Sequence, residues 1–165
     1  MKLSQGFAPH ASTDATKLIL GSMPGVASLE AGQYYAYGRN AFWKIIGDLY
    51  GAGPELDYQS RLKILSDRRI ALWDVIKNCH RPGSLDSSIA EAGLITNDFT
   101  HFFSQHSQIT RVYFNGLKAA SLFNKKVLPL IDKEIEYHLL PSTSPANAAT
   151  DYAAKLQAWS VLTTD

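Results

Sequence analysis

A few polar side chains in this sequence stand where chemistry is possible. Asp74 lies inside the apolar run over residues 70–76, where a carboxylate must be solvated, paired or used. Tyr35 lies in a Gly- and Tyr-rich stretch, and Asn40 comes just before an amphipathic segment. With Asn115, which follows a later apolar run, they form a set of amides, aromatics and one carboxylate. Such a set suits a hydrolysis in which water is the nucleophile and the leaving group is a nucleobase.

A glycine-rich turn follows the first apolar run of the chain. The run over residues 17–20 stops at Gly21 and continues as Ser-Met-Pro-Gly. Gly21 and Gly25 permit a tight turn that brings backbone N–H groups close to a ligand. A plain turn from a strand to a helix has the same signature, so the turn alone leaves both readings open. A buried strand that ends in such a turn is where α/β proteins usually bind a ligand.

Several common catalytic motifs are absent from the sequence. The chain has neither the Gly-x-Gly-x-x-Gly of dinucleotide-binding proteins nor a Gly-Lys-Ser or Gly-Lys-Thr phosphate loop. Ser22 lacks the second glycine of a nucleophile elbow. Cys79 is the only cysteine, which excludes an intrachain disulfide, an iron–sulfur cluster and a Cys-rich zinc site. The histidines form no short ligand pair on a helix, so we expect neither a metal nor a cofactor; they are His10, His80, His101, His106 and His138.

Composition and charge set broad limits on the class of protein. The chain has 165 residues, of which 45% are hydrophobic and 19% charged, values that indicate one globular domain. A formal net charge of +1 argues against a generally basic nucleic-acid coat but allows a local basic patch. No apolar run is long enough for a signal peptide or a membrane span, so we expect a cytoplasmic protein.

The spacing of apolar runs predicts the elements that position these residues. We expect buried strands over residues 17–20, 70–76, 111–114 and 135–140. An amphipathic helix is expected to start after Asn40, which would be its N-cap. Further amphipathic helices are expected over residues 58–66 and 117–128, and residues 98–106 have weak helical character. A final amphipathic helix carries Tyr152, Leu156, Trp159 and Leu162. Residues 77–88 are predicted to form a polar loop and residues 1–16 a surface lead-in.

Alternation of strands and helices predicts the fold class. It implies an α/β protein, a three-layer α/β/α sandwich with a central four-stranded parallel sheet, built as a single domain over residues 1–165. Active-site loops should then meet at the carboxyl ends of the strands. These loops are residues 21–40, 74–84, 115–117 and 141–147.

Five motifs in this order resemble the uracil-DNA glycosylase superfamily. They are GSMPG at 21–25, QYYAYGRNAFWK at 33–44, LWDVI-x4-RPGS at 72–84, YFNG at 113–116 and LPSTSPAN at 140–147. The chain is most similar to the hypoxanthine (deoxyinosine) DNA glycosylase branch, which is related to the mismatch-specific uracil and thymine glycosylases. The resemblance covers residues 17–160 and implies base excision from DNA.

The resemblance implies an unusual catalytic residue. In the wider superfamily the first motif carries an Asp or Asn that handles the attacking water, and here Met23 stands in that place. Methionine can neither polarise water nor accept its proton. The hypoxanthine branch similarly lacks this group, and the Asn before the Phe-Trp pair takes over, which is Asn40 in this chain. A helix cap and a catalytic amide are compatible roles for Asn40.

The resemblance also implies which residues contact the base. Tyr35 corresponds to the aromatic residue that stacks on the extruded base, although a core tyrosine is the alternative. Asp74 matches a position, commonly Asn, that reads the base edge, and a carboxylate accepts the ring N–H that uracil and hypoxanthine share. The remaining predicted base contacts are Gly21, Ser22, Met23, Pro24, Gly25, Phe42 and Asn115.

A loop near the carboxyl end is expected to contact DNA. Leu140 replaces the His or Asn that stabilises the departing base anion in relatives. The following residues keep the character of a wedge that enters the duplex; they are Pro141, Ser142, Thr143, Ser144 and Pro145. Additional phosphate contacts are expected from Lys44, Arg81, Lys118 and Lys126.

The sequence therefore predicts a monofunctional DNA glycosylase of base excision repair. It would flip hypoxanthine, and secondly uracil, out of DNA and hydrolyse the N-glycosidic bond, as a monomer without metal or cofactor. Two alternatives remain open. The apolar Met23 and Leu140 suit a catalytically silent nucleic-acid or nucleotide-binding module on the same fold, and a hydrolase of small nucleoside-like substrates is the other.

Overall fold

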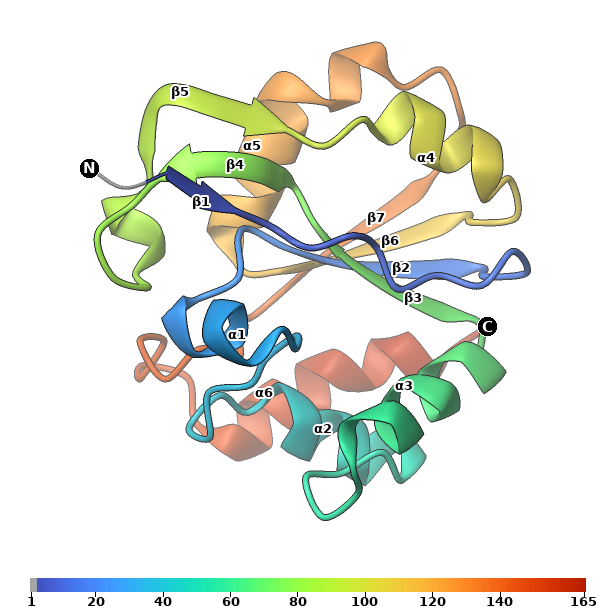
Figure 1. Cartoon of the computed structure of the whole chain (residues 1–165). Coiled ribbons are helices and arrows are strands. Elements are labelled where there is room, and N and C mark those ends of the chain that lie inside the picture. Colours follow the sequence, from blue (N-terminus) through green and yellow to red (C-terminus); the bar gives the residue numbers. More distant parts are fainter. Residues whose placement is uncertain (1–2) are drawn as a thin grey trace.

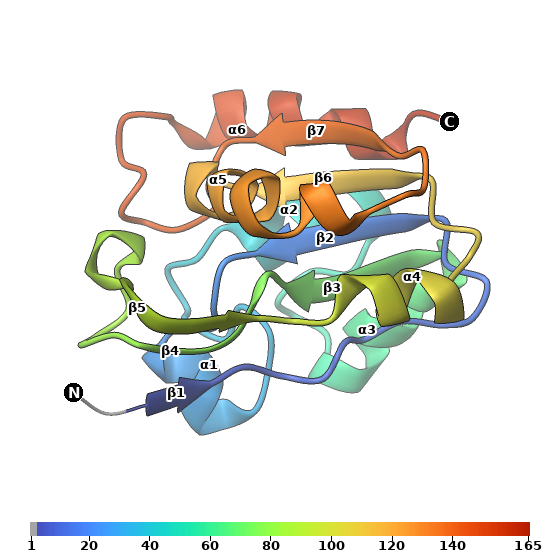
Figure 2. The ribbon, with the colours of Figure 1, turned by 90° about the horizontal axis from the view of Figure 1, so that it is seen from above.

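A four-stranded parallel sheet forms the centre of the molecule, in a computed structural model that describes residues 3–165. Its strand order is β3 (Ile70–Asp74), β2 (Lys17–Gly21), β6 (Arg111–Asn115) and β7 (Glu136–Leu140). Figure 2 shows all four arrowheads pointing the same way, so the four carboxyl ends share one edge. The predicted central sheet is confirmed.

Helices cover both faces of this sheet (Figure 1). On one side lie α1 (Val26–Ala31), α2 (Phe42–Tyr50), α3 (Tyr58–Asp67) and α6 (Tyr152–Trp159). On the other lie α4 (Phe99–Gln105) and α5 (Leu117–Lys126). Short 3-10 helices follow at η1 (Asp86–Ser88), η2 (Leu128–Leu130) and η3 (Ser160–Thr163). The three-layer arrangement is the predicted one.

Two hydrophobic clusters hold the layers together, one on each face of the sheet. Successive residues of β2 alternate between them, since Ile19 belongs to the cluster with α2, α3 and α6, whereas Leu18 and Leu20 belong to the cluster with α4 and α5. All three are fully buried. This two-sided burial explains why the central strands are apolar throughout rather than alternating. Among residues 3–165, no helix is both long and apolar enough to span a bilayer.

A second sheet, which the sequence did not predict, lies beside the first. It is antiparallel, in the order β1 (Leu3–Gln5), β4 (Ile76–His80) and β5 (Ala90–Thr96). The predicted polar loop is therefore wrong over residues 77–80. The predicted lead-in is wrong over residues 3–5, which pair with β4; residues 1–2 lie outside the described part of the chain.

Candidate active site

A cleft of about 1320 Å³ opens at the carboxyl edge of the parallel sheet. The loops that follow the strands line it, together with the segment between α1 and α2, as the topology predicts. Fourteen of the fifteen predicted site residues form its wall: Gly21, Ser22, Met23, Pro24, Gly25, Tyr35, Asn40, Asp74, Asn115, Pro141, Ser142, Thr143, Ser144 and Pro145. The exception is Phe42.

The glycine at the end of β2 leaves room for two functional side chains. Gly21 pairs with Asp74 of β3 in the parallel register. A Cβ atom at position 21 would lie 2.5 Å from the Asp74 Oδ1 and 3.1 Å from the Tyr35 hydroxyl. The missing side chain therefore lets the carboxyl and the hydroxyl meet over the backbone of the turn.

We expect Gly21→Ala to damage both the fold and the cleft. An added methyl group in a packed site typically costs about 1 to 3 kcal/mol, and here it must displace Asp74, Tyr35 or both. Each 1.4 kcal/mol corresponds to about tenfold in an equilibrium or rate. Urea unfolding and single-turnover assays measure the two losses.

Gly38→Ala is the matched control for this substitution. A Cβ at Gly38 meets nothing within 4 Å, and Gly38 is not among the glycines with positive φ. This variant should behave like the unmodified protein. Equal behaviour of the two variants would contradict the close packing over Gly21.

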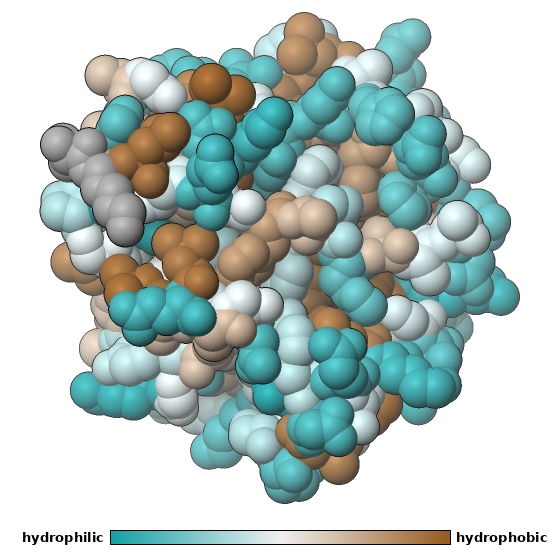
Figure 3. Space-filling model, in the orientation of Figure 1, coloured by the Kyte–Doolittle hydropathy of each residue, from teal (hydrophilic) through white to brown (hydrophobic). Residues whose placement is uncertain are grey.

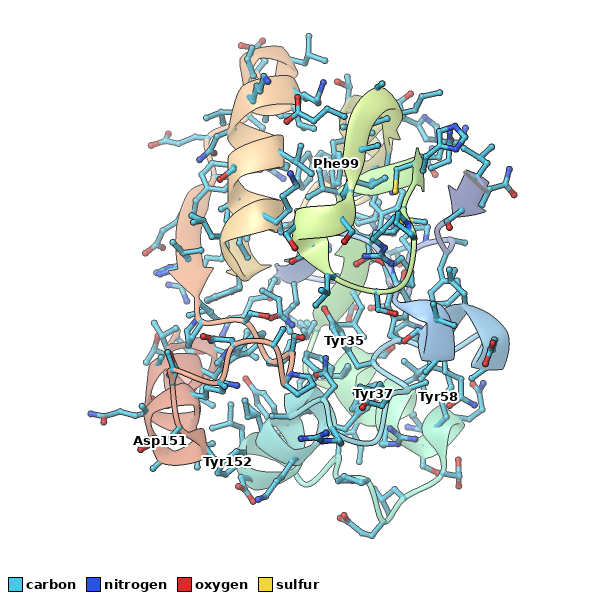
Figure 4. The ribbon with its side chains drawn as sticks, turned by 90° about the vertical axis from the view of Figure 1, so that its left-hand side faces the viewer. Tyr35, Tyr37, Tyr58, Phe99, Asp151 and Tyr152 are labelled. Atoms are coloured by element: carbon cyan, nitrogen blue, oxygen red, sulfur yellow. The ribbon has the colours of Figure 1, made fainter. Side chains whose placement is uncertain are left out.

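Two neighbouring tyrosines of the cleft wall are held in different ways. Tyr34 is fixed in the core, where its hydroxyl donates to the Ala8 carbonyl at 2.8 Å and its carbonyl accepts from the Trp43 indole at 2.8 Å. Tyr35 has φ +55°, a left-handed conformation that is rare outside glycine and is often found at functional sites. Figure 4 shows Tyr35 between the loop that leads to α6 and the segment around α1. The unusual backbone turns its ring toward the cleft.

Phe42 supports the Tyr35 ring from behind and does not line the cleft, so its predicted contact with the base is wrong. The two rings stack with centroids 4.0 Å apart and planes 26° apart. Phe42 is fully buried, and edge-on contacts with Trp43 and Trp159 hold it in place. Its role in this structure is to fix one face of Tyr35.

Asn40 is held at the wall of the cleft by hydrogen bonds on both sides. Its backbone N–H donates to the Tyr37 carbonyl, and its Oδ1 accepts from the Phe42 N–H at 2.9 Å. The next residue, Ala41, is the N-cap of α2 and donates its N–H to the Thr143 carbonyl. The prediction that Asn40 caps the helix is therefore wrong by one position. Because an amide oxygen has two lone pairs, Oδ1 can accept a second hydrogen bond from a water molecule.

Asp74 is the buried carboxyl group of the cleft. It is 4% exposed, and its Oδ2 has no hydrogen-bond partner among the described residues. Burial raises its pKa to about 7, with the nearby Asp86 carboxylate acting in the same direction and Arg81 against it. Burial and the charge of Asp74 also raise the pKa of Tyr35, so the phenol stays neutral.

The loop after β4 fixes the glycine turn from outside. Ser22 donates its hydroxyl hydrogen to Asp86, and the Val26 N–H donates to the Ser84 hydroxyl at 2.8 Å. Arg81 is buried and donates to the Pro24 carbonyl at 2.5 Å. Arg81 thus braces the turn, and its predicted role as a phosphate contact is wrong.

The loop after β7 is anchored to the sheet through Asn115. The Asn115 amide donates to the Thr143 hydroxyl and accepts from the Thr143 N–H, both at 2.9 Å. The Trp159 indole donates to the Pro141 carbonyl at 2.9 Å. Because its amide is engaged, Asn115 serves here to position the loop, and its predicted contact with a base remains a prediction.

Exposed leucines and one arginine, which the sequence did not single out, line the mouth of the cleft. Leu117 is 68% exposed, Leu139 57% and Leu85 54%. Figure 3 shows apolar side chains gathering on the side of the molecule that carries α1 and the η1 loop. Arg39, at the end of the Tyr-rich stretch, is exposed and is the one cation among the described residues of the wall. Leucine and arginine at such a mouth suit a partner with both apolar and anionic parts.

Within residues 3–165, no three acidic, histidine or cysteine side chains lie close enough together to hold a metal ion.

Known proteins with similar sequences point to one family. The family described as the uracil DNA glycosylase superfamily matches residues 8–163. A protein of Methanosarcina acetivorans named hypoxanthine DNA glycosylase is 35% identical over 147 residues, which cover 88% of this chain and 89% of that relative. A protein of the same name from Methanosarcina barkeri is 36% identical over 116 residues, covering 70% of this chain and 72% of that relative.

A solved structure is similar over almost the whole chain. This solution NMR structure, from Methanosarcina acetivorans, is provisionally described as a uracil DNA glycosylase. It superimposes with a TM-score of 0.80 at 30% sequence identity. The alignment covers 99% of this chain and 100% of the solved chain. The resemblance carried by the five sequence motifs is confirmed. The chain belongs to the uracil DNA glycosylase superfamily.

Proposed function

We propose that this protein is a monofunctional DNA glycosylase that hydrolyses the N-glycosidic bond of deaminated bases in DNA, hypoxanthine first and uracil second, as a step of base excision repair. The observation that carries this proposal is the convergence of Asn40, Tyr35 and Asp74 on one cleft, in a chain with relatives named hypoxanthine DNA glycosylase. One domain over residues 1–165 acts as a monomer in the cytoplasm.

The base enters between the Tyr35 ring and the glycine turn. Stacking on an aromatic face contributes roughly 1 to 3 kcal/mol per base. Ser22, Met23 and Gly25 line the cleft wall, and their backbone N–H groups can donate to carbonyl oxygens of the base. Asp74 faces the edge of the base. These contacts are available only to a nucleotide that has left the helix stack.

Water attacks the sugar after or as the base departs. Asn40, fixed by the Phe42 N–H, positions this water through its Oδ1. An amide is a weak base, so positioning and electrostatic stabilisation supply most of the rate enhancement. No lysine is among the described residues of the cleft wall, so a Schiff base is not expected and strand cleavage should not accompany base release.

The DNA duplex lies across the mouth of the cleft. The loop over residues 141–145 enters the duplex, and the exposed Leu85, Leu117 and Leu139 at the mouth lie against the DNA around the flipped nucleotide. Arg39 contacts a phosphate. A single cation at the mouth and a net charge of +1 predict moderate affinity that falls with added salt.

Base release from defined oligonucleotides tests the proposal. Duplexes with one deoxyinosine, deoxyuridine or mismatched thymine are incubated with excess protein, and free base and abasic sites are measured. Hypoxanthine release without strand cleavage is expected. If the folded protein releases none of these bases but still binds the duplex, the silent binding module is the correct alternative.

A further inference from the structure

One oxygen of the Asp74 carboxyl group is buried at the cleft without a protein partner. Asp74 ends β3 and forms part of the cleft wall. Its Oδ1 lies over Gly21, whereas Oδ2 accepts no hydrogen bond from any residue in the range 3–165. Buried polar atoms normally have partners, and an exception in a cleft calls for a ligand. Oδ2 is therefore suited to face a bound base.

Four titratable or charged groups face Asp74 from the surrounding elements. Tyr34 and Tyr35 come from the segment after α1, Arg81 from the loop after β4 and Asp86 from η1. Burial, with the negative charge of Asp86, raises the pKa of Asp74 to about 7 against the opposing effect of Arg81. Both tyrosine pKa values are raised by burial, so neither phenol carries a charge. A large share of the molecules thus holds a proton on Asp74 at neutral pH.

Two other side-chain donors close to Asp74 already have acceptors. The Ser22 hydroxyl donates to Asp86, and the Asn115 amide donates to Thr143. Leu140, which ends β7, is apolar and packs in the core. A protonated Asp74 therefore offers a buried donor that has no acceptor among the described residues.

A proton donor beside the base assists its departure. When the C1′–N bond breaks, both electrons of the bond leave with the base, and the sugar becomes oxocarbenium-like. Negative charge develops on the ring nitrogens and the conjugated carbonyl oxygen of the base. A proton donor against these atoms lowers the barrier, and burial strengthens the effect.

We infer that Asp74 is the general acid of the reaction, an assignment that rests on the glycosylase function proposed above. As the C1′–N bond breaks, the Oδ2–H group gives its proton to a carbonyl oxygen of the departing base. Asp74 becomes a carboxylate. Water adds to C1′ and releases a proton, which restores the acid form of Asp74. The net reaction consumes one water and yields the free base and an abasic sugar.

The pH dependence of single-turnover base release tests this role. The probe is a duplex oligonucleotide with one deoxyinosine, assayed from pH 5.5 to 9. Above about pH 7 the rate should fall by up to tenfold per pH unit, because the carboxylate has no proton to give. Asp74→Asn keeps the size of the side chain but cannot transfer a proton. It should be about a hundredfold slower at pH 6 and should lose the alkaline limb of the profile.

Asp86→Asn is a matched second variant, because it changes the charge near Asp74 and leaves Asp74 itself in place. The asparagine keeps an Oδ1 that can accept from Ser22. Removing the negative charge should lower the pKa of Asp74 and shift the alkaline limb to lower pH. If Asp74 had a purely structural role, the pH at which the rate falls would not change in Asp86→Asn.

Three outcomes would overturn the assignment of Asp74. One is a wild-type rate that stays level or rises between pH 7 and 9. Another is an alkaline limb that persists in Asp74→Asn. The third is a variant that binds the duplex more weakly but releases base at the wild-type rate once bound, since this indicates base reading alone. If the wild-type protein releases no base at any pH, the glycosylase function fails as well.

The stability of the fold provides a readout that does not need activity. The folded-state pKa of Asp74, about 7, lies above its ordinary value of 3.8. The stability that the neutral carboxyl contributes is fully present below pH 3.8 and is lost as pH rises through 7. Relative to Asp74→Asn, the wild-type unfolding constant should rise by up to tenfold per pH unit in this range. Urea unfolding at pH 5 and pH 8 measures it, and an equal pH dependence of both proteins would contradict a buried acid.

Discussion

Asn40→Ala should lower the rate of base release by about 10²- to 10⁴-fold, the loss typical of a positioned catalytic group. The reason is geometric, because the Phe42 N–H fixes the amide oxygen at the cleft wall and alanine has no atom to hold the water there. Single-turnover release of hypoxanthine, with protein in excess over a deoxyinosine duplex, measures the chemical step. Binding to the same duplex should change little.

Asn124→Ala is the matched control for Asn40→Ala. Asn124 is exposed on α5 and is not part of the cleft wall, so the same loss of an amide there should leave the rate unchanged. A small loss of rate in Asn40→Ala, with a clear loss of affinity, would instead favour the silent binding module. Thermal unfolding of both variants checks that the bond to Phe42 contributes little to the stability of the fold.

The central sheet could be predicted from sequence because its strands are buried on both faces. Such strands are continuous apolar runs, and β2, β3 and β6 each stop at a residue that enters the cleft: Gly21, Asp74 and Asn115. Parallel pairing then brings these residues to one edge whatever the details of the loops. The position of the site therefore follows from the strand ends alone.

The second sheet could not be predicted because its strands lack this signal. The sequence of β4 is IKNCH, and only Ile76 and Cys79 of its five residues are buried. Pairing with β5 is interrupted by irregularities in register, and β1 has three residues. Short, polar strands with bulges give neither an apolar run nor a strict alternation. Their contribution to the site is indirect, through the loop that carries Arg81 and Asp86.

The roles of individual residues were harder to predict than their places. Arg81 is cationic and lies near a Pro-Gly turn, but its side chain is buried against the Pro24 carbonyl. Phe42 is two residues from Asn40, yet the start of α2 directs its ring into the core. In both cases the side-chain direction depends on contacts distant in sequence, which a local pattern does not contain. The sequence thus predicts where a site residue lies more reliably than it predicts what its side chain contacts.

Phe42→Ala should be the most destabilising single change near the cleft. Truncation of a fully buried phenylalanine typically costs about 3 to 5 kcal/mol, and Phe42 contacts the rings of Tyr35, Trp43 and Trp159. Urea unfolding measures the loss. Tyr35 would also lose the ring on which it stacks. Because the left-handed backbone of Tyr35 is strained, the loss of this packing should let the Tyr35 side chain move. Hypoxanthine release should therefore fall even at temperatures where the variant stays folded.

Phe103→Ala separates these two effects. Phe103 is 5% exposed and packs in the other hydrophobic cluster, around α4, so its loss destabilises the fold without touching Tyr35. At a temperature where both variants are folded, Phe103→Ala should release base at nearly the wild-type rate and Phe42→Ala should not. Phe42→Leu, which refills much of the space, should recover part of the stability but less of the activity, because an aliphatic side chain offers no flat face to Tyr35. Full activity in folded Phe42→Ala would show that Tyr35 does not depend on this support, and an unchanged stability with lost activity would return Phe42 to the role of a base contact.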